Sequence, residues 1–547
     1  MSQNGADVTE PRREDRDVEE RRRGAPEAHA SEMTPVLHVP RLADALAPNE
    51  LAKLGTDELV RFLTPRRWFG AKAGAPSAAR VRDVIPLPWE GGSFAIARLE
   101  VTTGNTAQPR LYQVPLCVRS IDEIGDAPPR STLARVVAGD GEGLLFDAVE
   151  DGAFLRVLAD SFQHGGSFGS AESSWVIEPL SATPLVIPPT AQLRVGSAEQ
   201  SNTSLVIGDQ AILKLFRKLE QGEHPDVELT RFLTLDARFP HTPALLGVAR
   251  FEDGGRVTVA GMLQEFLPGS RDAWAYALAK GRPYFQAARE GNPANEFVAD
   301  AERLGVVTRA MHEALATGHA DALAPEPVDQ PTVQRWAARA KEWIRDGFAL
   351  LEKQLRARAL PKERVPEAEA LVRRGDHYVG LVDEIVNNIR GDAGLAIRIH
   401  GDYHLGQVLR TAGDDFMVID FEGEPARPLA ERREKASPLR DVAGMLRSFA
   451  YAAATLGMEA KGLDMPTREL RIGRWERDTR EAFLRGYLRE PASGRGASRI
   501  LPTDSGHTRA LLRLFETEKA FYELMYELNN RPEWTWIPMR GIAKSSQ

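Results

Sequence analysis

Short hydrophobic runs separated by turn-forming residues dominate the chain between residues 42 and 193. Runs of this length, bounded by Gly, Pro, Asn or Asp, predict β-strands rather than helices. This part of the sequence therefore predicts a β-rich domain. The clearest runs lie at residues 81–86, 94–101, 111–116 and 144–149, ahead of a Gly-rich stretch at 164–170.

A second strand pattern, at residues 204–216, contains a tight turn. Apolar runs at 204–207 and 211–216 flank Gly208-Asp209, and such a pair between two apolar runs is a hairpin signal. Pro225 is expected to begin a short helix that continues to residue 233, because proline fits the first turn of a helix. The pattern predicts two paired strands followed by one helix.

Beyond Arg271 the spacing of hydrophobic positions becomes helical, and one strand–loop–strand unit at residues 395–420 interrupts the helices. The expected organisation is a tail at 1–40, a β-rich domain at 41–190, a strand-and-helix unit at 191–270 and a helical region at 271–547. The predicted helices lie at residues 297–316, 333–355, 367–388, 437–456 and 508–530.

Composition and charge narrow the class of protein. The chain has 547 residues and a net charge of -8, which argues against the basic surface that nucleic-acid binding requires. Cys117 is the single cysteine, so an intramolecular disulfide and a four-thiolate zinc site are excluded. Residues 10–23 are highly charged and no apolar stretch follows them, so we expect a disordered tail, no signal peptide, no membrane span and a cytoplasmic location.

Two polar clusters in the 395–420 unit carry the strongest chemical signal. The first cluster is His400-Gly-Asp402, and Gln407 lies seven residues after His400. The second cluster is Asp420-Phe-Glu, which follows the apolar run at residues 416–419. Phosphoryl transfer needs a carboxylate to accept the proton of the acceptor hydroxyl, and oxygen ligands that hold Mg²⁺. Gln407 lies 5 residues and Asp420 lies 18 residues after Asp402, which matches the spacing of the kinase base and its two metal ligands. The alternative is that both aspartates only cap turns.

Lys214 is the candidate phosphate-binding residue upstream. It lies in the apolar run 211–216, and a kinase uses a strand lysine that is oriented by a helix glutamate, for which Glu228 is the candidate. The ordinary alternative is a lysine on a solvated strand face. The preceding loop offers hydroxyl and backbone donors for phosphate at Ser201, Asn202 and Thr203, although such clusters are often plain turns.

A strand that ends in a Pro-Gly break, at residues 261–269, is typical of a hinge between two lobes. Backbone groups near Glu265 and Leu267 are candidates for binding the adenine edge of a nucleotide. The alternative is an edge strand and its turn. A Gly-Lys-Ser/Thr phosphate loop is absent from the sequence, so a nucleotide site of that other type is disfavoured.

Several of these motifs resemble the bacterial maltokinases, including the kinase part of those fused to trehalose synthase, within the aminoglycoside-phosphotransferase-like group. The similarity begins near residue 51 and continues to the C-terminus. The run Asp420-Phe-Glu-Gly-Glu is the most specific to maltokinases, whereas His-Gly-Asp is shared by the whole group. The segments that carry the resemblance are 67–69, 202–232, 400–409, 419–429, 437–448 and 522–534.

The resemblance implies an α+β, bilobal protein-kinase-like fold with an extra β-rich N-terminal cap domain. It implies ATP-dependent phosphorylation of maltose with Mg²⁺, giving maltose 1-phosphate for α-glucan (glycogen) synthesis from trehalose. By motif, Asp402 is the catalytic base, Gln407 and Asp420 bind Mg²⁺, and Lys214 binds phosphate and pairs with Glu228. A separate trehalose synthase is a possible partner. Alternatives are a kinase of glucosamine or an aminoglycoside, and a non-catalytic kinase-like scaffold.

The acceptor sugar is expected against the last long helix. Tyr522 and Tyr526 are one helical turn apart, beside a stripe of apolar residues that accounts for core packing, and Trp534 follows the helix. Aromatic faces and hydroxyl groups commonly bind sugars, and His404 near the base is a further candidate. The alternative is that these aromatic residues only fill the core. Trp68 and Phe69 are interpreted as core residues of the cap.

Overall fold

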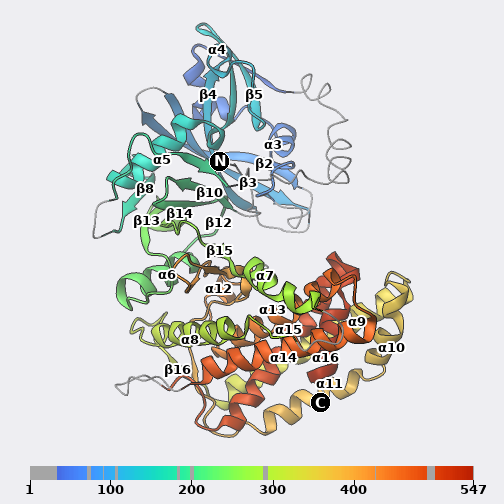
Figure 1. Cartoon of the computed structure of the whole chain (residues 1–547). Helices are drawn as coiled ribbons and strands as arrows, with labels where there is room; N and C mark the ends of the chain where they lie inside the picture. Colours follow the sequence, from blue (N-terminus) through green and yellow to red (C-terminus); the bar gives the residue numbers. More distant parts are fainter. Residues whose placement is uncertain are drawn as a thin grey trace, which may run out of the picture.

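The computed structural model describes residues 34–69, 76–89, 92–104, 109–181, 185–196, 202–287, 293–425, 427–489 and 499–545. The expected tail up to residue 33 and the candidate phosphate ligand Ser201 lie outside these ranges. Figure 1 shows two β-sheets gathered at one end of the molecule and a large helical lobe at the other. The overall class is α+β, as predicted.

The first sheet, which we call the cap sheet, is built mainly from the predicted strands of the β-rich domain. Its order is β1-β5-β6-β4-β3-β2, and β12 pairs with β4. Strand β1 pairs in parallel with β5, so the expected end of the tail at residue 40 is corrected: residues 36–39 gain backbone hydrogen bonds and bury Leu37 and Val39. The bounds are β1 Val36–Val39, β2 Pro76–Trp89, β3 Gly92–Thr103, β4 Arg110–Ser120, β5 Thr132–Ala138, β6 Gly141–Asp147 and β12 Lys218–Leu219.

The second sheet, the kinase sheet, has the order β7-β8-β13-β14-β11-β10-β9. The predicted hairpin is confirmed: Ile207 faces Ala211 across a turn in which Gly208 has φ 56°, a value that glycine adopts without strain. Strands β7 and β8 belong to this sheet, so the expected domain boundary at 190 lies too late in the chain. The bounds are β7 Gly166–Gly169, β8 Ser173–Pro179, β9 Leu193–Val195, β10 Asn202–Ile207, β11 Ala211–Phe216, β13 Leu245–Asp253 and β14 Arg256–Glu265.

The two sheets share one hydrophobic core and several polar contacts. Phe94 and Phe146 of the cap pack in the same buried cluster as Leu213 and Phe251 of the kinase sheet. Helix α5 (Gly152–His164) contributes Phe154, Leu158 and Phe162 to this cluster. The cap is therefore fixed to the kinase sheet by buried apolar surface, which is the main source of folding stability.

The helical lobe surrounds the central helix α13, which is buried along most of its length. The predicted helix 367–388 is two helices, α10 and α11, which are separated at Arg373-Arg374. The bounds are α6 Pro225–Arg231, α7 Ala273–Gln286, α8 Val298–Leu315, α9 Gln330–Arg356, α10 Val365–Val372, α11 Gly375–Asn387, α13 Leu439–Glu459, α14 Met465–Leu488, α15 Ser505–Asn530 and α16 Trp536–Ser545.

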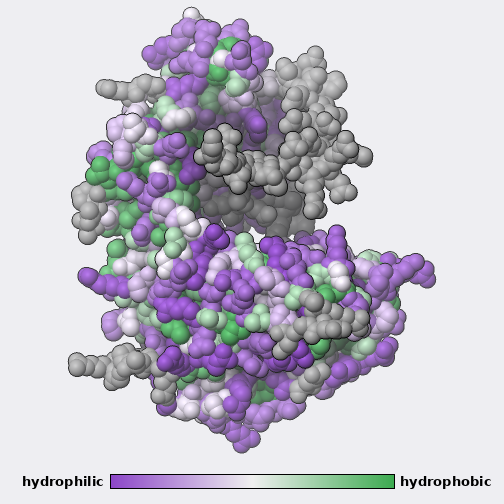
Figure 2. Space-filling view, in the orientation of Figure 1, coloured by the Kyte–Doolittle hydropathy of each residue, from purple (hydrophilic) through white to green (hydrophobic). Residues whose placement is uncertain are grey.

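The exposed face of the helical lobe is largely hydrophilic in the view of Figure 2. Within the described ranges, every helix is too short or too polar to cross a membrane. The lobe also holds short strands near the predicted catalytic unit. These are β15 Arg271–Asp272, β16 Glu326–Pro327, β17 Leu395–Ala396, β18 Val408–Arg410 and β19 Phe416–Val418.

Candidate active site

A buried carboxylate on α13 holds the loop that carries Asp402. Asp441 on α13 accepts hydrogen bonds from the backbone N–H of His400 at 2.8 Å and of Gly401 at 2.9 Å, and His312 Nε2 lies 3.1 Å from the same carboxylate. A Cβ at Gly444, one turn along α13, would lie 2.6 Å from the carbonyl oxygen of Tyr403. The helix and the loop therefore pack closely, which gives Asp402 a rigid base.

The loop that carries Asp420 is joined to the Asp402 loop. The N–H of Ile419 donates to the carbonyl of Gln407 at 3.0 Å, and His400 Nε2 lies 2.9 Å from the carbonyl of Ile419. Asp420 has φ 70°, in the left-handed region that non-glycine residues rarely adopt and that is often found at functional sites. The predicted unit thus brings the two polar clusters together.

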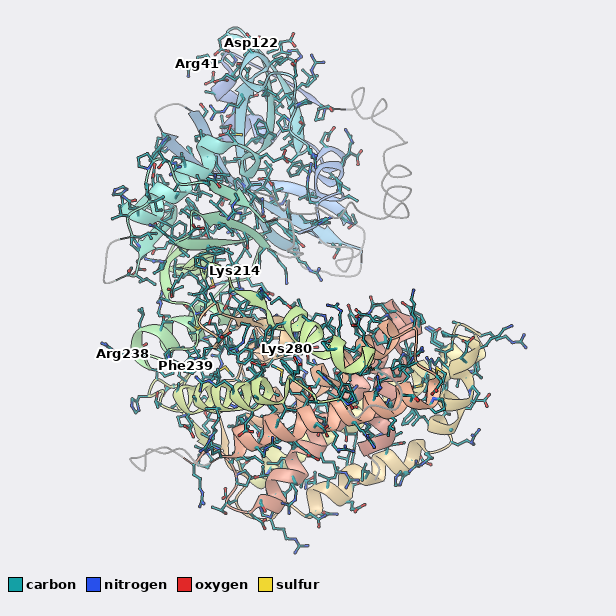
Figure 3. All side chains as sticks on the ribbon, in the orientation of Figure 1. Arg41, Asp122, Lys214, Arg238, Phe239 and Lys280 are labelled. Atoms are coloured by element: carbon teal, nitrogen blue, oxygen red, sulfur yellow. The ribbon has the colours of Figure 1, made fainter. Side chains whose placement is uncertain are left out.

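Lys214 projects from β11 toward the Asp420 loop. Its Nζ lies 3.1 Å from Asp420 Oδ1 and 3.1 Å from Asp226 Oδ2. Burial raises the pKa of Asp420, but Lys214, His400 and Gln407 together outweigh it and hold this pKa below its ordinary value. Figure 3 shows Lys214 at the junction between the sheets and the helical lobe.

The predicted pairing of Lys214 with Glu228 is corrected by the structure. Asp226, two residues earlier on α6, faces Lys214, and its Oδ1 also accepts the N–H of Phe421 at 2.9 Å. Glu228 instead contacts Arg398 and Arg433. Residues two apart on a helix point in different directions, so only one of the two carboxylates can face the lysine.

The candidate nucleotide groups lie around β10, β11 and the end of β14. Thr203 Oγ1 accepts a hydrogen bond from Arg217 Nε at 2.8 Å, and Asn202 lies opposite Phe216 in the hairpin. Glu265 lies opposite Ala211, so the proposed hinge adjoins the strand of Lys214. The carbonyl of Leu267 accepts the Ser270 hydroxyl at 2.7 Å, which closes the turn after the strand.

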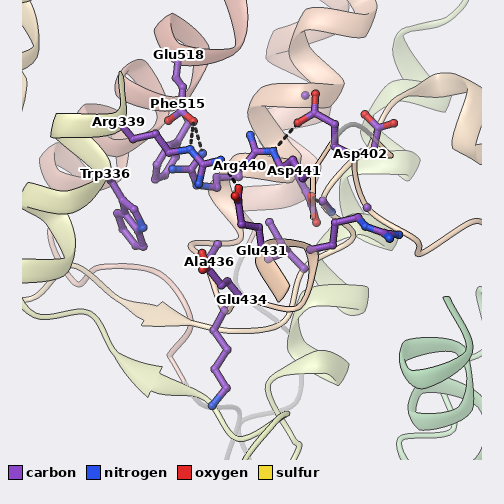
Figure 4. Close-up of a pocket in the computed structure, with 18 of the residues that line it drawn as sticks. Trp336, Arg339, Asp402, Glu431, Glu434, Ala436, Arg440, Asp441, Phe515 and Glu518 are labelled. Carbon is purple, nitrogen blue, oxygen red and sulfur yellow. Dashed lines mark hydrogen bonds and ion pairs between the residues drawn. The ribbon is translucent and has the colours of Figure 1, made fainter. Parts of the chain in front are cut away.

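Asp402 opens onto a cavity of about 620 Å³ in the helical lobe. Figure 4 shows Asp402 on one side of this cavity and Trp336 on the opposite side. Lys519 Nζ lies 3.8 Å from Asp402 Oδ1 and 4.6 Å from the ring centre of Tyr522. The volume falls within the roughly 300–1,000 Å³ of small-molecule sites. We call this space the acceptor cavity.

The structure separates the aromatic residues that the sequence grouped. Tyr522 lines the acceptor cavity and lies edge-on to Trp343, with ring centres 5.4 Å apart. Tyr526 and Trp534 are not among the described residues that line it. The guanidinium of Arg531 instead lies over both rings, and Trp534 stacks on Tyr451. These contacts place both rings outside the described lining of the cavity, although Tyr526 lies only one turn along α15 from Tyr522, and this corrects their expected position at the sugar.

His404 lies beside the predicted base and outside the described lining of the acceptor cavity. Its Nε2 is 4.0 Å from Asp402 Oδ2, and its Nδ1 accepts the N–H of Gly406 at 3.0 Å. Burial is the main cause that lowers the pKa of His404, which favours the neutral ring. His404 therefore belongs to the edge of the Asp402 loop.

Four residues near the site have no role in the sequence analysis. Asp226 contacts Lys214 and Asp441 holds the Asp402 loop, whereas Lys519 and Glu424 line the acceptor cavity. Lys519 lies about one helical turn before Tyr522, on the same face of the helix. The pattern that indicated Tyr522 could therefore have indicated Lys519 as well. Glu424 lies in the specific run after Asp420. Asp226 gave no signal that distinguishes it from Glu228 on the same helix.

The donor set at Gln407 and Asp420 fits a magnesium ion. A carboxylate and an amide oxygen are hard ligands, and Mg²⁺ usually keeps waters and phosphate oxygens as its other ligands. The Gln407 side chain also hydrogen-bonds Asp420 and helps to lower the pKa of that carboxyl. Within the described residues, no group of three or more His, Cys, Asp or Glu side chains is placed to hold a metal. Two protein ligands are sufficient for an ion that binds together with a nucleotide.

Comparison with known proteins supports the expected relationship. Residues 62–151 match the family model of the maltokinase N-terminal cap domain. A glucosamine kinase from Streptacidiphilus jiangxiensis is 25% identical over 344 residues, covering 62% of this chain and 70% of the relative. A glucosamine kinase from Mycolicibacterium smegmatis is 28% identical over 349 residues, covering 62% and 76%.

The fold has a counterpart among solved structures. A glucosamine kinase in complex with glucosamine, ADP and inorganic phosphate superposes with a TM-score of 0.61 at 20% identity, covering 91% of this chain and 98% of that structure. The resemblance to maltokinases within their wider kinase group is confirmed. The predicted bilobal kinase-like fold with an N-terminal cap domain is confirmed as well.

Proposed function

We propose that this chain is an ATP-dependent sugar kinase that phosphorylates maltose at its anomeric hydroxyl to give maltose 1-phosphate. The observation that carries the proposal is the position of Asp402, at the wall of the acceptor cavity and in one joined unit with Gln407 and Asp420. This arrangement would place an acceptor hydroxyl between a proton acceptor and the phosphate-binding groups. Such positioning supplies most of the catalysis in phosphoryl transfer.

Each residue then has a defined task. Asp402 accepts the proton of the acceptor hydroxyl, and Lys214 binds phosphate oxygens of the nucleotide. Thr203, Asn202 and the backbone near Glu265 and Leu267 are the proposed nucleotide contacts. A magnesium ion held by Gln407 and Asp420 would neutralise charge on the phosphates. Nucleotide use is supported by the ADP in the similar solved structure.

Part of the acidic charge in the wall of the acceptor cavity is compensated by basic side chains. Three acidic side chains of its wall already have basic partners: Glu424 contacts Arg427, Glu431 contacts Arg339, and Glu518 contacts Arg440. An amino sugar would need a carboxylate to compensate its ammonium group. These three carboxylates are already compensated, but Glu434 also lines the cavity and is a further carboxylate that an ammonium group would meet. The charges therefore do not decide between the two sugars, and the maltokinase-type cap is what favours maltose.

The second candidate is an amino-sugar kinase. It is favoured by the two relatives that are named glucosamine kinases and by the similar structure that contains glucosamine. A panel of maltose, glucosamine and glucose, assayed by nucleotide depletion with ³¹P NMR of the product, separates the two. Maltose consumption with an anomeric phosphate supports the proposal. A preference for glucosamine would replace it with the second candidate.

The metabolic setting follows from this substrate. Maltose 1-phosphate would feed α-glucan (glycogen) synthesis in the cytoplasm, and a separate trehalose synthase is the proposed partner that supplies maltose. Co-purification of the two enzymes from a cell extract, with and without trehalose, tests the partnership. Failure to co-purify would leave the kinase proposal intact and remove the proposed complex.

A further inference from the structure

One wall of the acceptor cavity is formed by residues 427–435, which we call the strap. The strap connects the Asp420 loop to α13 and contains the short helix α12 (Leu429–Arg432). It brings charged side chains of both signs to the cavity. Those that line it are Arg427, Glu431, Arg432, Arg433, Glu434 and Lys435.

Two adjacent arginines of the strap reach residues between β11 and the end of α6. Arg433 donates two hydrogen bonds to Glu228 on α6, from Nη2 at 2.8 Å and from Nε at 3.2 Å. Arg432 pairs with Glu220, just after β12, and its Nη1 donates to the carbonyl of Glu422 at 3.1 Å. The strap is therefore attached to the part of the molecule that holds the nucleotide candidates.

Glu228 is also bound by Arg398, which lies just before the Asp402 loop. Arg398, two residues before His400, donates from Nη1 to Glu228 Oε2 at 2.6 Å and is 1% exposed. Burial raises the pKa of Glu228, but hydrogen bonds from Arg433 and the charge of Arg398 outweigh it and keep this pKa low. A charged hydrogen-bonded pair that is shielded from water is stronger than an exposed ion pair.

The other end of the strap is attached to the helical lobe. Glu431 accepts from Arg339 on α9 at 3.1 Å, and Lys435 pairs with Glu326 and donates to the carbonyl of Asp321 at 2.7 Å. The strap thus bridges α6 and the helical lobe along the side of the cavity. A ligand in the cavity would contact this bridge directly.

Helix α6 connects the strap to Lys214. Asp226, on the same short helix as Glu228, contacts Lys214 and accepts the N–H of Phe421. We infer that Arg433 and Glu228 are positioning residues that couple the acceptor cavity to Lys214, with Glu228 acting as the anchor of α6 rather than as the lysine's partner. The inference rests on the proposed function for the identity of the two ligands.

Arg433→Gln is the variant of choice, because Arg433 is 32% exposed and Glu228 keeps Arg398 as its partner. Arg282→Gln is the matched control: Arg282 also donates from Nε and Nη2 to one carboxylate, that of Glu459, but this pair lies outside the strap and outside the described lining of the cavity. The measurements are calorimetric binding of a non-hydrolysable ATP analogue with Mg²⁺, with and without maltose, and hydrogen exchange of the amides at 225–236.

In Arg433→Gln we expect the Kd of the analogue to rise about 5-fold or more without sugar, faster exchange in α6, and loss of any maltose effect on this Kd. Arg282→Gln should stay within about 2-fold of the native Kd, with native exchange in α6. Native nucleotide binding and native exchange in Arg433→Gln, or equal effects of both variants, would overturn the inference. If the native protein phosphorylates no sugar, the proposed function is refuted. Amide exchange in α6, compared between the two variants and the native protein, still tests this inference.

Discussion

The guanidinium of Arg217 lies 2.8 Å from the carboxylate of Asp147, and both side chains are fully buried between the cap sheet and the kinase sheet. Arg217 follows β11, three residues after Lys214, and also donates to Thr203. The guanidinium lies 4.8 Å from the ring centre of Trp68. The cap therefore contacts Arg217, a residue that closely follows Lys214, the candidate phosphate-binding residue.

Loss of this buried pair should destabilise the protein. Asp147→Ala leaves the Arg217 charge buried without its partner, which costs about 3–5 kcal/mol in unfolding free energy. Urea denaturation followed by circular dichroism measures the change. Glu142→Ala is the control, because it breaks an exposed pair with Arg135 in the same sheet and should cost less than about 1 kcal/mol. Equal effects of the two variants would contradict the structural role given to Arg217.

Asp402→Asn should abolish nearly all turnover and preserve the fold. The amide cannot accept the proton of the acceptor hydroxyl, and removal of such a base costs about 10²–10⁴ in rate. Steady-state kinetics and the melting temperature give the two readouts. The backbone of this loop is held by Asp441, so the fold does not depend on the Asp402 side chain. A rate near that of the native protein would remove Asp402 from the mechanism.

Gln407→Ala should raise the Mg²⁺ concentration that gives half-maximal activity. The variant loses one oxygen ligand, while Asp420 and the phosphates remain, so excess Mg²⁺ should restore part of the rate. Asp420→Ala should not be rescued in this way, because it also removes a contact of Lys214. Identical Mg²⁺ titrations for the native protein and both variants would count against this metal site.

Tyr522→Phe and Tyr526→Phe form a matched pair on one helix. Only Tyr522 lines the acceptor cavity, so loss of its hydroxyl should raise KM for the sugar several-fold, consistent with about 0.5–1.5 kcal/mol for one hydrogen bond. Tyr526→Phe should leave KM unchanged, since this ring lies beside Arg531. Initial rates over a range of maltose concentrations measure both values. The opposite ranking would place the sugar farther along α15.

Acid should weaken the junction between β4 and α5. Arg119 contacts Asp151, which caps α5; burial raises the pKa of this carboxyl, but hydrogen bonds from Arg119 and Phe154 outweigh it and lower the pKa from 3.8. A depressed pKa gives stability above the unfolded-state pKa that is lost as pH falls through the folded-state value. Urea titrations between about pH 5 and pH 2 should show a smaller acid loss in Asp151→Asn than in the native protein. Parallel pH profiles would contradict the shift.

The sequence by itself determined many local elements and the candidate catalytic unit of this protein. Short apolar runs bounded by turn residues predicted the strands of the cap and the 204–216 hairpin. The short spacing from Asp402 to Asp420 confined these residues to one strand–loop–strand unit, so their proximity followed from chain connectivity. Several segments indicated the family, and the run after Asp420 was the most specific of them.

Only the tertiary structure decided which distant side chains meet. Asp226 and Glu228 are both acidic residues of one helix, and the packing of α6 against the Asp420 loop and the strap assigned one to Lys214 and the other to Arg433. Tyr522 and Tyr526 likewise differ by one turn, yet the cavity reaches only the first. Strands β7 and β8 joined the kinase sheet through pairing with β13, a partner more than sixty residues away. Such choices depend on long-range contacts that no local pattern of residues encodes.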